Sequence, residues 1–311
     1  MVIQDRIIVA NTGEDTLTLI NSNDPYRKET ISLYNLISKE GKKTFFLENY
    51  QLGPWDLMIN KEGLIYSVNA YDNSVFKIDM DNRTILDSIK VGRFPTCIKS
   101  FNDNVFISNS DSNSISVIDE NDFSLMENIP VGEKPTDIQI DKNYYKVYVA
   151  NSNGYSIDIL DLKRENVETI KLNKHPVKLV LEEDKIFVLC YVNNGVINYS
   201  NLSVIELEGY KTVLSIELKG IFTNLIKIRG KDIFYLSNIE DGCLYKIDLS
   251  NENNIKRLHL GGMPNNMHWD GKSKLYITNI LDSLLTIFDT NNQKILNNIK
   301  VGKEPNGLLL L

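Results

Sequence analysis

The chain has 311 residues, of which 42% are hydrophobic and 24% are charged, with a net charge of −7. This composition is typical of a soluble globular protein, and the negative charge argues against broad binding of nucleic acid or anionic membranes. No apolar run approaches the roughly 18–20 residues of a membrane span, so no membrane insertion is expected. The N-terminus lacks a basic, then apolar, signal segment. A cytoplasmic protein is therefore expected, whereas a chain trimmed of such a segment would be secreted or displayed at the surface.

The first fifty residues predict strands followed by an insertion. Arg6–Asn11 and the apolar residues leading to Asn21 read as two strands. Residues 22–43 then hold an excess of about twenty residues over the later repeats. The segment 25–38 is long enough for an extra strand or a short helix, and is expected to join the third and fourth strands of its sheet. It would project from the side opposite the proline-containing turns described next.

A short phrase of the form Val-Gly-x-x-Pro recurs along the rest of the chain. Its copies end at Pro54, Pro95, Pro135, Pro176, Pro264 and Pro305. They recur roughly every 40 residues, and the double interval before Pro264 contains a degenerate copy that ends at Phe222. A period of this length, built of short strands, predicts the blades of a β-propeller.

Residues 131–171 illustrate one repeat. Four apolar stretches read as short strands: 136–140, 146–151, 156–161 and 168–172. Turn residues such as Ser152-Asn-Gly154 separate them, so we expect four antiparallel strands in each blade. The predicted blades are 51–90, 91–130, 131–171, 172–218, 219–259, 260–300, and a composite of 301–311 with 1–50.

Asn and Asp mark fixed positions in six of the seven predicted blades. An Asn follows an aromatic or aliphatic residue by three positions, as in Tyr148 and Asn151, and an Asn or Asp follows ten residues later, as at Asp161. We interpret both as turn residues whose side chains accept backbone N–H bonds. The blade that begins at 172 departs from the spacing, because Cys190 replaces the Asn and residues 191–201 contain six extra residues.

The two ends of the chain complement each other. Residues 301–311 supply one phrase and one strand, whereas residues 1–50 lack a first strand. Joined, they make a seventh blade. The sequence thus predicts one all-β domain over residues 1–311, a seven-bladed propeller of four-stranded antiparallel blades. The ring is closed by N-terminal strands that pair with the C-terminal strand, which removes the unpaired sheet edge.

The tetrapeptides Tyr148-Val-Ala-Asn151 and Tyr276-Ile-Thr-Asn279, each with a Gly-x-x-Pro phrase upstream, resemble the YVTN-repeat β-propellers of surface-layer and secreted type. The resemblance covers essentially the whole chain. It implies a seven-bladed fold and a bacterial protein, and gives little guidance on function, because similar propellers include lactonases and the heavy subunits of quinone-dependent amine dehydrogenases.

The turns between second and third strands should share one face with the Gly-x-x-Pro turns, and we refer to it as the top face. The leading hypothesis is a non-enzymatic binding or scaffolding propeller, which recognises a protein or peptide, a sugar or a small polar ligand there. The candidate residues are Trp55, Asp56, Arg93, Lys134, Asp137, His175, Lys178, Tyr191, Tyr199, Asn224 and Asn266. Trp55 is expected at the channel mouth, and Trp269 between blades.

Two alternatives stay open. A lactonase-like hydrolase could work at the channel mouth, where Asp56, Asp137, His175 and Lys178 are expected on one rim and could do acid–base chemistry. A polyanion such as nucleic acid could bind a patch of rim cations: Arg93, Lys134, Lys174, Lys178 and Lys303. No catalytic motif occurs, and the three cysteines (Cys97, Cys190, Cys243) and three histidines show no zinc-like spacing. We therefore predict no catalytic residues, no cofactor, no metal, and a monomer in a reducing compartment.

Overall fold

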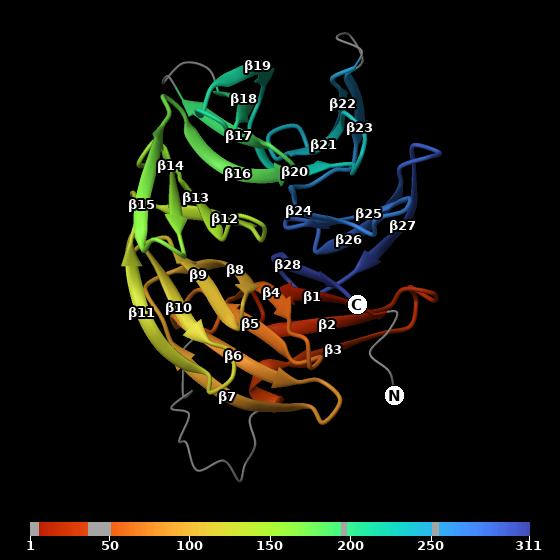
Figure 1. The fold of residues 1–311 in the computed structure, drawn as a ribbon. Helices are drawn as coiled ribbons and strands as arrows, with labels where there is room; N and C mark the ends of the chain where they lie inside the picture. Colours follow the sequence, from red (N-terminus) through yellow and green to blue (C-terminus); the bar gives the residue numbers. More distant parts are fainter. Residues whose placement is uncertain (1–5, 37–50, 194–197, 251–254) are drawn as a thin grey trace.

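The computed structural model describes residues 6–36, 51–193, 198–250 and 255–311. It contains seven four-stranded antiparallel sheets that stand around a common centre (Figure 1). In these ranges the single helical element is a 3₁₀ turn, η1 (Leu33–Leu36). The predicted all-β propeller is confirmed. No helix in the described residues is long and apolar enough to span a bilayer.

The blades follow one another in chain order. Blade 1 contains β4 (Pro54–Ile59), β5 (Ile65–Asn69), β6 (Ser74–Asp79) and β7 (Thr84–Lys90). Blade 2 contains β8 (Pro95–Phe101), β9 (Asn104–Asn109), β10 (Ser114–Asp119) and β11 (Ser124–Pro130). Blade 3 contains β12 (Pro135–Asp141), β13 (Lys146–Asn151), β14 (Ser156–Asp161) and β15 (Asn166–Lys171).

Blade 4 contains β16 (His175–Glu182), β17 (Lys185–Asn193), β18 (Asn198–Glu206) and β19 (Thr212–Lys219). Blade 5 contains β20 (Phe222–Lys227), β21 (Ile233–Asn238), β22 (Cys243–Asp248) and β23 (Ile255–His259). Blade 6 contains β24 (Pro264–Trp269), β25 (Lys274–Asn279), β26 (Leu284–Asp289) and β27 (Lys294–Lys300). Blade 7 combines β28 (Pro305–Leu310) with β1 (Arg6–Asn11), β2 (Thr16–Asn21) and β3 (Lys28–Ser32).

The ring closes in blade 7, as expected. The C-terminal strand β28 pairs antiparallel with β1, with Leu309 opposite Ile8 and Leu308 opposite Val9. The innermost strands contact their neighbours around the full ring, including β24 with β28 and β28 with β4. The terminal strand therefore holds the first and last parts of the chain together.

The core lies between the faces of neighbouring blades. The second strand of a blade is buried on both faces because a blade packs on either side of it, as in β9, where Val105 to Asn109 are all buried. Phe106 packs toward blade 3, in a cluster with Ile138 and Val149. Ile107 packs toward blade 1, in a cluster with Tyr66 and Val68. Seven such clusters distribute the hydrophobic stabilisation evenly around the ring.

The Gly-x-x-Pro turns and the turns between second and third strands share the top face. Their backbones are joined by hydrogen bonds in blade 2, where the Ser110 N–H donates to Phe94 O (3.0 Å) and the Asp111 N–H donates to Arg93 O (3.1 Å). The phrase glycine packs on the recurring Asn. A Cβ at Gly92 would lie 2.6 Å from Asn109 Cγ, which no real side chain tolerates. The two motifs therefore recur together because they contact each other.

The interpretation of the Asn and Asp positions is correct for the turns at the bottom face. Asp161 Oδ1 accepts the N–H groups of Lys163 and Arg164, at 3.0 and 3.1 Å. It is wrong for several of the top-face asparagines, whose amide donates to a hydroxyl five residues later, as Asn151 does to Ser156 (3.2 Å). These asparagines are buried and stabilise the hairpin from within.

The two irregular segments differ in how well they were predicted. The expectation that the segment 25–38 joins the third and fourth strands is wrong, because the fourth strand, β3, already begins at Lys28. Of the residues between β3 and blade 1, the described ones form η1. The rest of the predicted insertion, residues 37–43, lies outside the described residues, so the face from which it projects stays a prediction. In blade 4 the insertion lengthens the hairpin of β17 and β18 to nine residues each.

Candidate functional site

A channel of about 680 Å³ runs through the centre of the ring. Residues of the innermost strands of all seven blades line it. In every blade the pairing of the first and second strands is interrupted by a bulge just after the phrase proline or its equivalent, Phe222. A bulge re-aims side chains, and here it sets which residues of each strand face the channel.

Side chains facing the channel form two belts. The upper belt consists of the residues two positions after the phrase proline or Phe222 in blades 1 to 6: Asp56, Cys97, Asp137, Lys178, Asn224 and Asn266. In blade 7 this position is Gly307, which has no side chain. The lower belt lies two residues deeper, roughly 7 Å further from the top face, and consists of Met58, Lys99, Gln139, Val180, Ile226, His268 and Leu309. The two belts lie on the same side of each strand, because residues two positions apart on a β-strand share one face.

Asp56 joins blade 1 to blade 2. Its Oδ1 accepts the N–H of Leu57 (2.9 Å), and its Oδ2 accepts the N–H of Ile98 (3.0 Å) in the neighbouring blade. Desolvation raises the pKa of the Asp56 carboxyl, against the lowering effect of the Lys99 charge and the two N–H bonds. Both carboxylate oxygens are thus already engaged by backbone groups.

Asp137 joins blade 3 to blade 4 in the same way and carries an ion pair as well. Its Oδ2 accepts the N–H of Leu179 (2.8 Å), and its Oδ1 accepts a bond from Lys178 Nζ (2.9 Å). The Asp137 side chain is 2% exposed, and that of Lys178 is 24% exposed. Burial alone would lower the pKa of Lys178, but the Asp137 carboxylate outweighs it and holds that pKa above its usual value. Burial and Asp137 also raise the pKa of the Cys97 thiol, to about 12.

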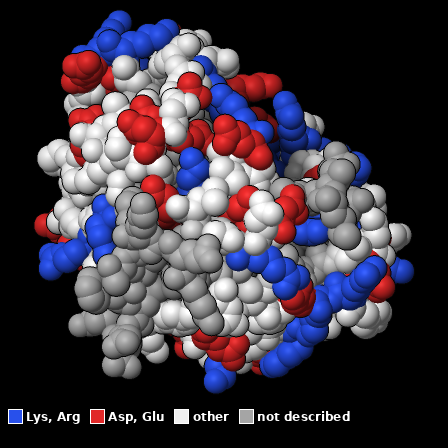
Figure 2. Space-filling view, turned by 90° about the horizontal axis from the view of Figure 1, so that it is seen from below, with Lys and Arg blue, Asp and Glu red and all other residues white. Residues whose placement is uncertain are grey.

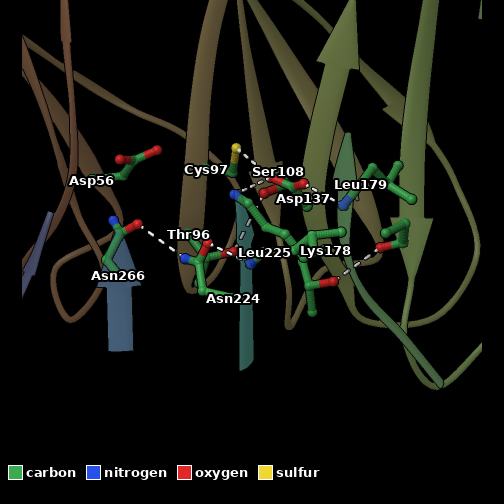
Figure 3. Close-up of polar contacts among 12 residues, drawn as sticks. Asp56, Thr96, Cys97, Ser108, Asp137, Lys178, Leu179, Asn224, Leu225 and Asn266 are labelled. Carbon is green, nitrogen blue, oxygen red and sulfur yellow. Dashed lines mark hydrogen bonds and ion pairs between the residues drawn. The ribbon is translucent and has the colours of Figure 1, made fainter. Parts of the chain in front are cut away.

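On the opposite side of the upper belt, amides replace the acids. Asn224 Nδ2 donates to Asn266 Oδ1 (3.0 Å) across the boundary of blades 5 and 6. Figure 3 shows this pair beside Lys178, which reaches toward Asp137, while Asp56 stands apart from Asp137. The upper belt is therefore a chain of contacts between blades, in which Asp56 and Asp137 do not form a carboxylate dyad.

The lower belt holds polar groups that the sequence reasoning missed: Lys99, Gln139 and His268. Within the described residues Lys99 and Gln139 have no side-chain hydrogen bond and no ion pair, and the His268 ring contacts the backbone of Trp269 alone. His268 is exposed to the channel, yet desolvation and then the Lys99 charge lower its pKa. All three could have been predicted, because residues two positions apart on a strand share one face. Lys99, Gln139 and His268 each lie two residues after an upper-belt residue.

The structure brings six of the predicted site residues to the channel and places the others elsewhere. The six are Trp55, Asp56, Asp137, Lys178, Asn224 and Asn266. Trp55 lies at the mouth, with its ring 5.4 Å from that of Phe94. Arg93 and Lys134 line a separate hollow of about 460 Å³ between blades 2 and 3, which also contains Asp111 and Glu133.

His175 and Tyr191 form an aromatic group on the rim of the top face, together with Tyr155. The His175 ring lies 4.4 Å from Tyr155 and 5.9 Å from Tyr191, and His175 Nδ1 lies 3.0 Å from Ser152 O. None of these side chains lines the channel, so His175 does not face Asp137 across it. Tyr199 lies half-buried in the hairpin of blade 4, opposite Val192 and Lys219.

The rim cations do not gather into one patch. Lys178 is paired inside the channel, and Lys303 Nζ lies 3.9 Å from Glu14. Lys174 lies in another hollow, beside Cys190. On the face seen in Figure 2, basic and acidic side chains are interspersed.

Other clusters of reactive groups are few. In the described parts of the chain, no three His, Cys, Asp or Glu side chains are grouped so as to hold a metal ion. Cys243 Sγ lies 3.6 Å from His259 Nδ1 in blade 5, but Cys243 is buried, and desolvation together with Asp241 raises its pKa. A thiol with a raised pKa is a poor nucleophile. Trp269 packs between blades 5 and 6, as expected.

No protein-family model matches this chain, and no curated protein matches it in sequence. Solved structures do match. Hydrazine synthase from Kuenenia stuttgartiensis is 17% identical, with a TM-score of 0.73 over 86% of this chain and 92% of that chain. A putative 6-phosphogluconolactonase from Bacteroides fragilis is 13% identical, with a TM-score of 0.72 over 99% and 98%. Virginiamycin B lyase from Staphylococcus aureus is 15% identical, with a TM-score of 0.69 over 84% and 89%.

At such identities the likeness shows the seven-bladed propeller fold alone, which proteins of different activity share. Membership of the YVTN-repeat family stays a prediction. The function has to be argued from the channel itself.

Proposed function

We propose that this protein is a non-enzymatic binding propeller that takes a small polar ligand into the mouth of its central channel. The observation that carries the proposal is that the polar side chains of the upper belt are bonded to neighbouring blades, whereas those of the lower belt are not. The carboxylate oxygens of Asp56 and Asp137 accept bonds from neighbouring blades, whereas Lys99 and Gln139 have no hydrogen bond or ion pair in the described chain. His268 contacts only the backbone of Trp269. Unpartnered polar groups in a concave site with apolar neighbours are what a ligand pocket contains.

The size of the channel favours a small ligand. A volume of about 680 Å³ lies in the usual range for small-molecule pockets. The mouth offers Trp55 as a platform and the hydroxyl groups of Thr96, Thr136 and Thr223 around it. A macromolecular partner would have to bind the rim, where the aromatic group of Tyr155, His175 and Tyr191 lies outside the channel.

Intrinsic fluorescence tests the proposal, because the chain has two tryptophans and both Trp55 and Trp269 line the channel. A panel of neutral sugars, organic acids and short peptides should contain compounds that change tryptophan emission and raise the melting temperature. The variants Trp55→Phe and Trp269→Phe assign the signal to one end of the channel. Tyr144→Ala is the matched control, because Tyr144 is 69% exposed in a bottom-face turn. A panel with no hit up to millimolar concentration would contradict the proposal.

The hydrolase alternative is tested on the same preparation. Because Asp56 and Asp137 do not form a dyad, and His175 lies outside the channel, we expect no turnover of lactones or esters that depends on them. Turnover by the unmodified protein that disappears in a folded Asp137→Asn variant would contradict the binding proposal and establish an enzyme.

A further inference from the structure

The lower belt is divided into polar and apolar arcs. Going around the ring from blade 1, Met58 is followed by Lys99 and Gln139, then by Val180 and Ile226. His268 of blade 6 and Leu309 of blade 7 complete the belt. The polar pair in blades 2 and 3 and the imidazole in blade 6 are thus separated by an apolar pair on either side.

Among the described lysines that line the channel, Lys99 is the one without an ion pair. Lys178 is paired with Asp137, and Lys227 is paired with Glu182 near the bottom of the channel. Lys99 forms no ion pair with any described residue. Its field lowers the pKa of Asp56, but the two oxygens of Asp56 accept backbone N–H bonds instead. The channel therefore holds a half-buried cation that has no bonded counterion and is free to bind an anion.

We propose that the channel binds a small organic carboxylate whose anionic group lies between Lys99 and His268 and whose apolar part contacts the apolar arcs of the lower belt. This inference rests on the proposed binding function and deepens it. Lys99 supplies the charge, the Gln139 amide supplies a further donor, and a protonated His268 supplies a second charged donor. Val180 and Ile226 on one side, and Leu309 and Met58 on the other, form the apolar walls.

The proposal includes a dependence on pH. Desolvation and the charges of Lys99 and Lys178 lower the pKa of His268, whereas a hydrogen bond to the backbone of Trp269 and the charge of Asp270 raise it. Lys227 on the neighbouring β20 also lines the channel and is neutralised by Glu182, and Tyr276 lies opposite His268 on β25. A bound carboxylate favours the imidazolium, so it raises the pKa of His268. Affinity should therefore increase as pH falls from the raised pKa of His268 in the complex to its lower pKa in the free protein, by up to about tenfold per pH unit, and should be constant below that.

Sodium butyrate and its neutral analogue butyramide test the proposal, with tryptophan emission and the NMR signals of the His268 imidazole as readouts. At pH 5.5 butyrate should bind at least tenfold more tightly than butyramide. The affinity for butyrate should be lower at pH 8 than at pH 5.5. Extending the chain from acetate to hexanoate should tighten binding by about fourfold per methylene, until the apolar arcs are covered. The pKa of His268 should rise when butyrate binds.

Two variants locate the site. Lys99→Met should weaken butyrate at least tenfold without changing butyramide, and His268→Asn should abolish the pH dependence. Lys61→Met and His259→Asn are the matched controls, since Lys61 has an 85% exposed side chain and His259 is exposed on β23. Melting temperatures confirm that the variants are folded.

Butyramide binding as tightly as butyrate, or an unchanged affinity in Lys99→Met, would overturn the carboxylate assignment. If neutral sugars still bound in the channel, the proposed binding function would survive that result. If no compound of any class bound, both proposals would fail.

Discussion

Replacing Asp137 by Asn should destabilise the protein far more than replacing Asp56 by Asn. Both carboxylates occupy the upper belt and join neighbouring blades through the same backbone contact. Asn fits that place, since blades 5 and 6 have Asn224 and Asn266 there. Asp56→Asn loses one N–H bond to a charged acceptor but also removes a desolvated charge, so its net cost at pH 7 should be at most about 1–2 kcal/mol.

Asp137→Asn in addition leaves Lys178 without its partner. Breaking a buried ion pair costs about 3–5 kcal/mol. Because the Lys178 side chain is 24% exposed to the channel, solvent screening reduces this, and we expect about 2–3 kcal/mol beyond the cost at Asp56. Urea denaturation gives both values from the shift of the midpoint.

The double variant Asp137→Asn/Lys178→Met checks the cause. If the loss comes from an uncompensated cation, removing the cation should restore about 2 kcal/mol, so the double variant is more stable than the sum of the single losses predicts. Equal losses at Asp56 and Asp137, or strictly additive losses in the double variant, would refute the assignment of the two roles.

Three further predictions follow from the ring. Burial raises the pKa of Asp56 in the folded state, so ionisation of Asp56 at pH 7 costs stability. In urea titrations the unmodified protein should therefore gain stability relative to Asp56→Asn as pH falls from 7 toward 4. A difference that does not change with pH would contradict this. A Cβ at Gly307 would lie 2.9 Å from Trp55 O, so Gly307→Val should cost about 1–3 kcal/mol and change Trp55 emission, and a neutral effect would speak against the close blade contact. Deletion of residues 302–311 removes β28 with buried Leu308 and should cause unfolding or aggregation in size-exclusion chromatography, whereas an unchanged melting temperature would disprove ring closure.

The fold could be predicted because its turns are chemically marked. The phrase glycine and the recurring Asn contact each other, so the sequence repeats both at a fixed spacing. The fourth strand of blade 7 is not flanked by such a Gly and Asn pair at a fixed spacing. Lys28, Glu29 and Thr30 are exposed on the outer edge and read as loop residues, which is why the insertion was placed before this strand and not after it.

The site could be predicted only in part. The residues two positions after each proline were identified, and the channel contains them. Their partners were not predictable, because a sequence does not show that the carboxylates of Asp56 and Asp137 meet the backbone of the next blade. Lys99 and His268 could have been predicted from the rule that residues two positions apart on a strand share one face. They were not, because the predicted site was limited to residues at the mouth of the channel.

A crystal structure of the protein grown with the compound that most strongly changes tryptophan emission tests the central claim most directly. We predict that the compound lies inside the channel, between the upper and lower belts. Density confined to the rim, in the Arg93–Lys134 hollow or against Tyr155 and Tyr191, would show that the channel is not the binding site.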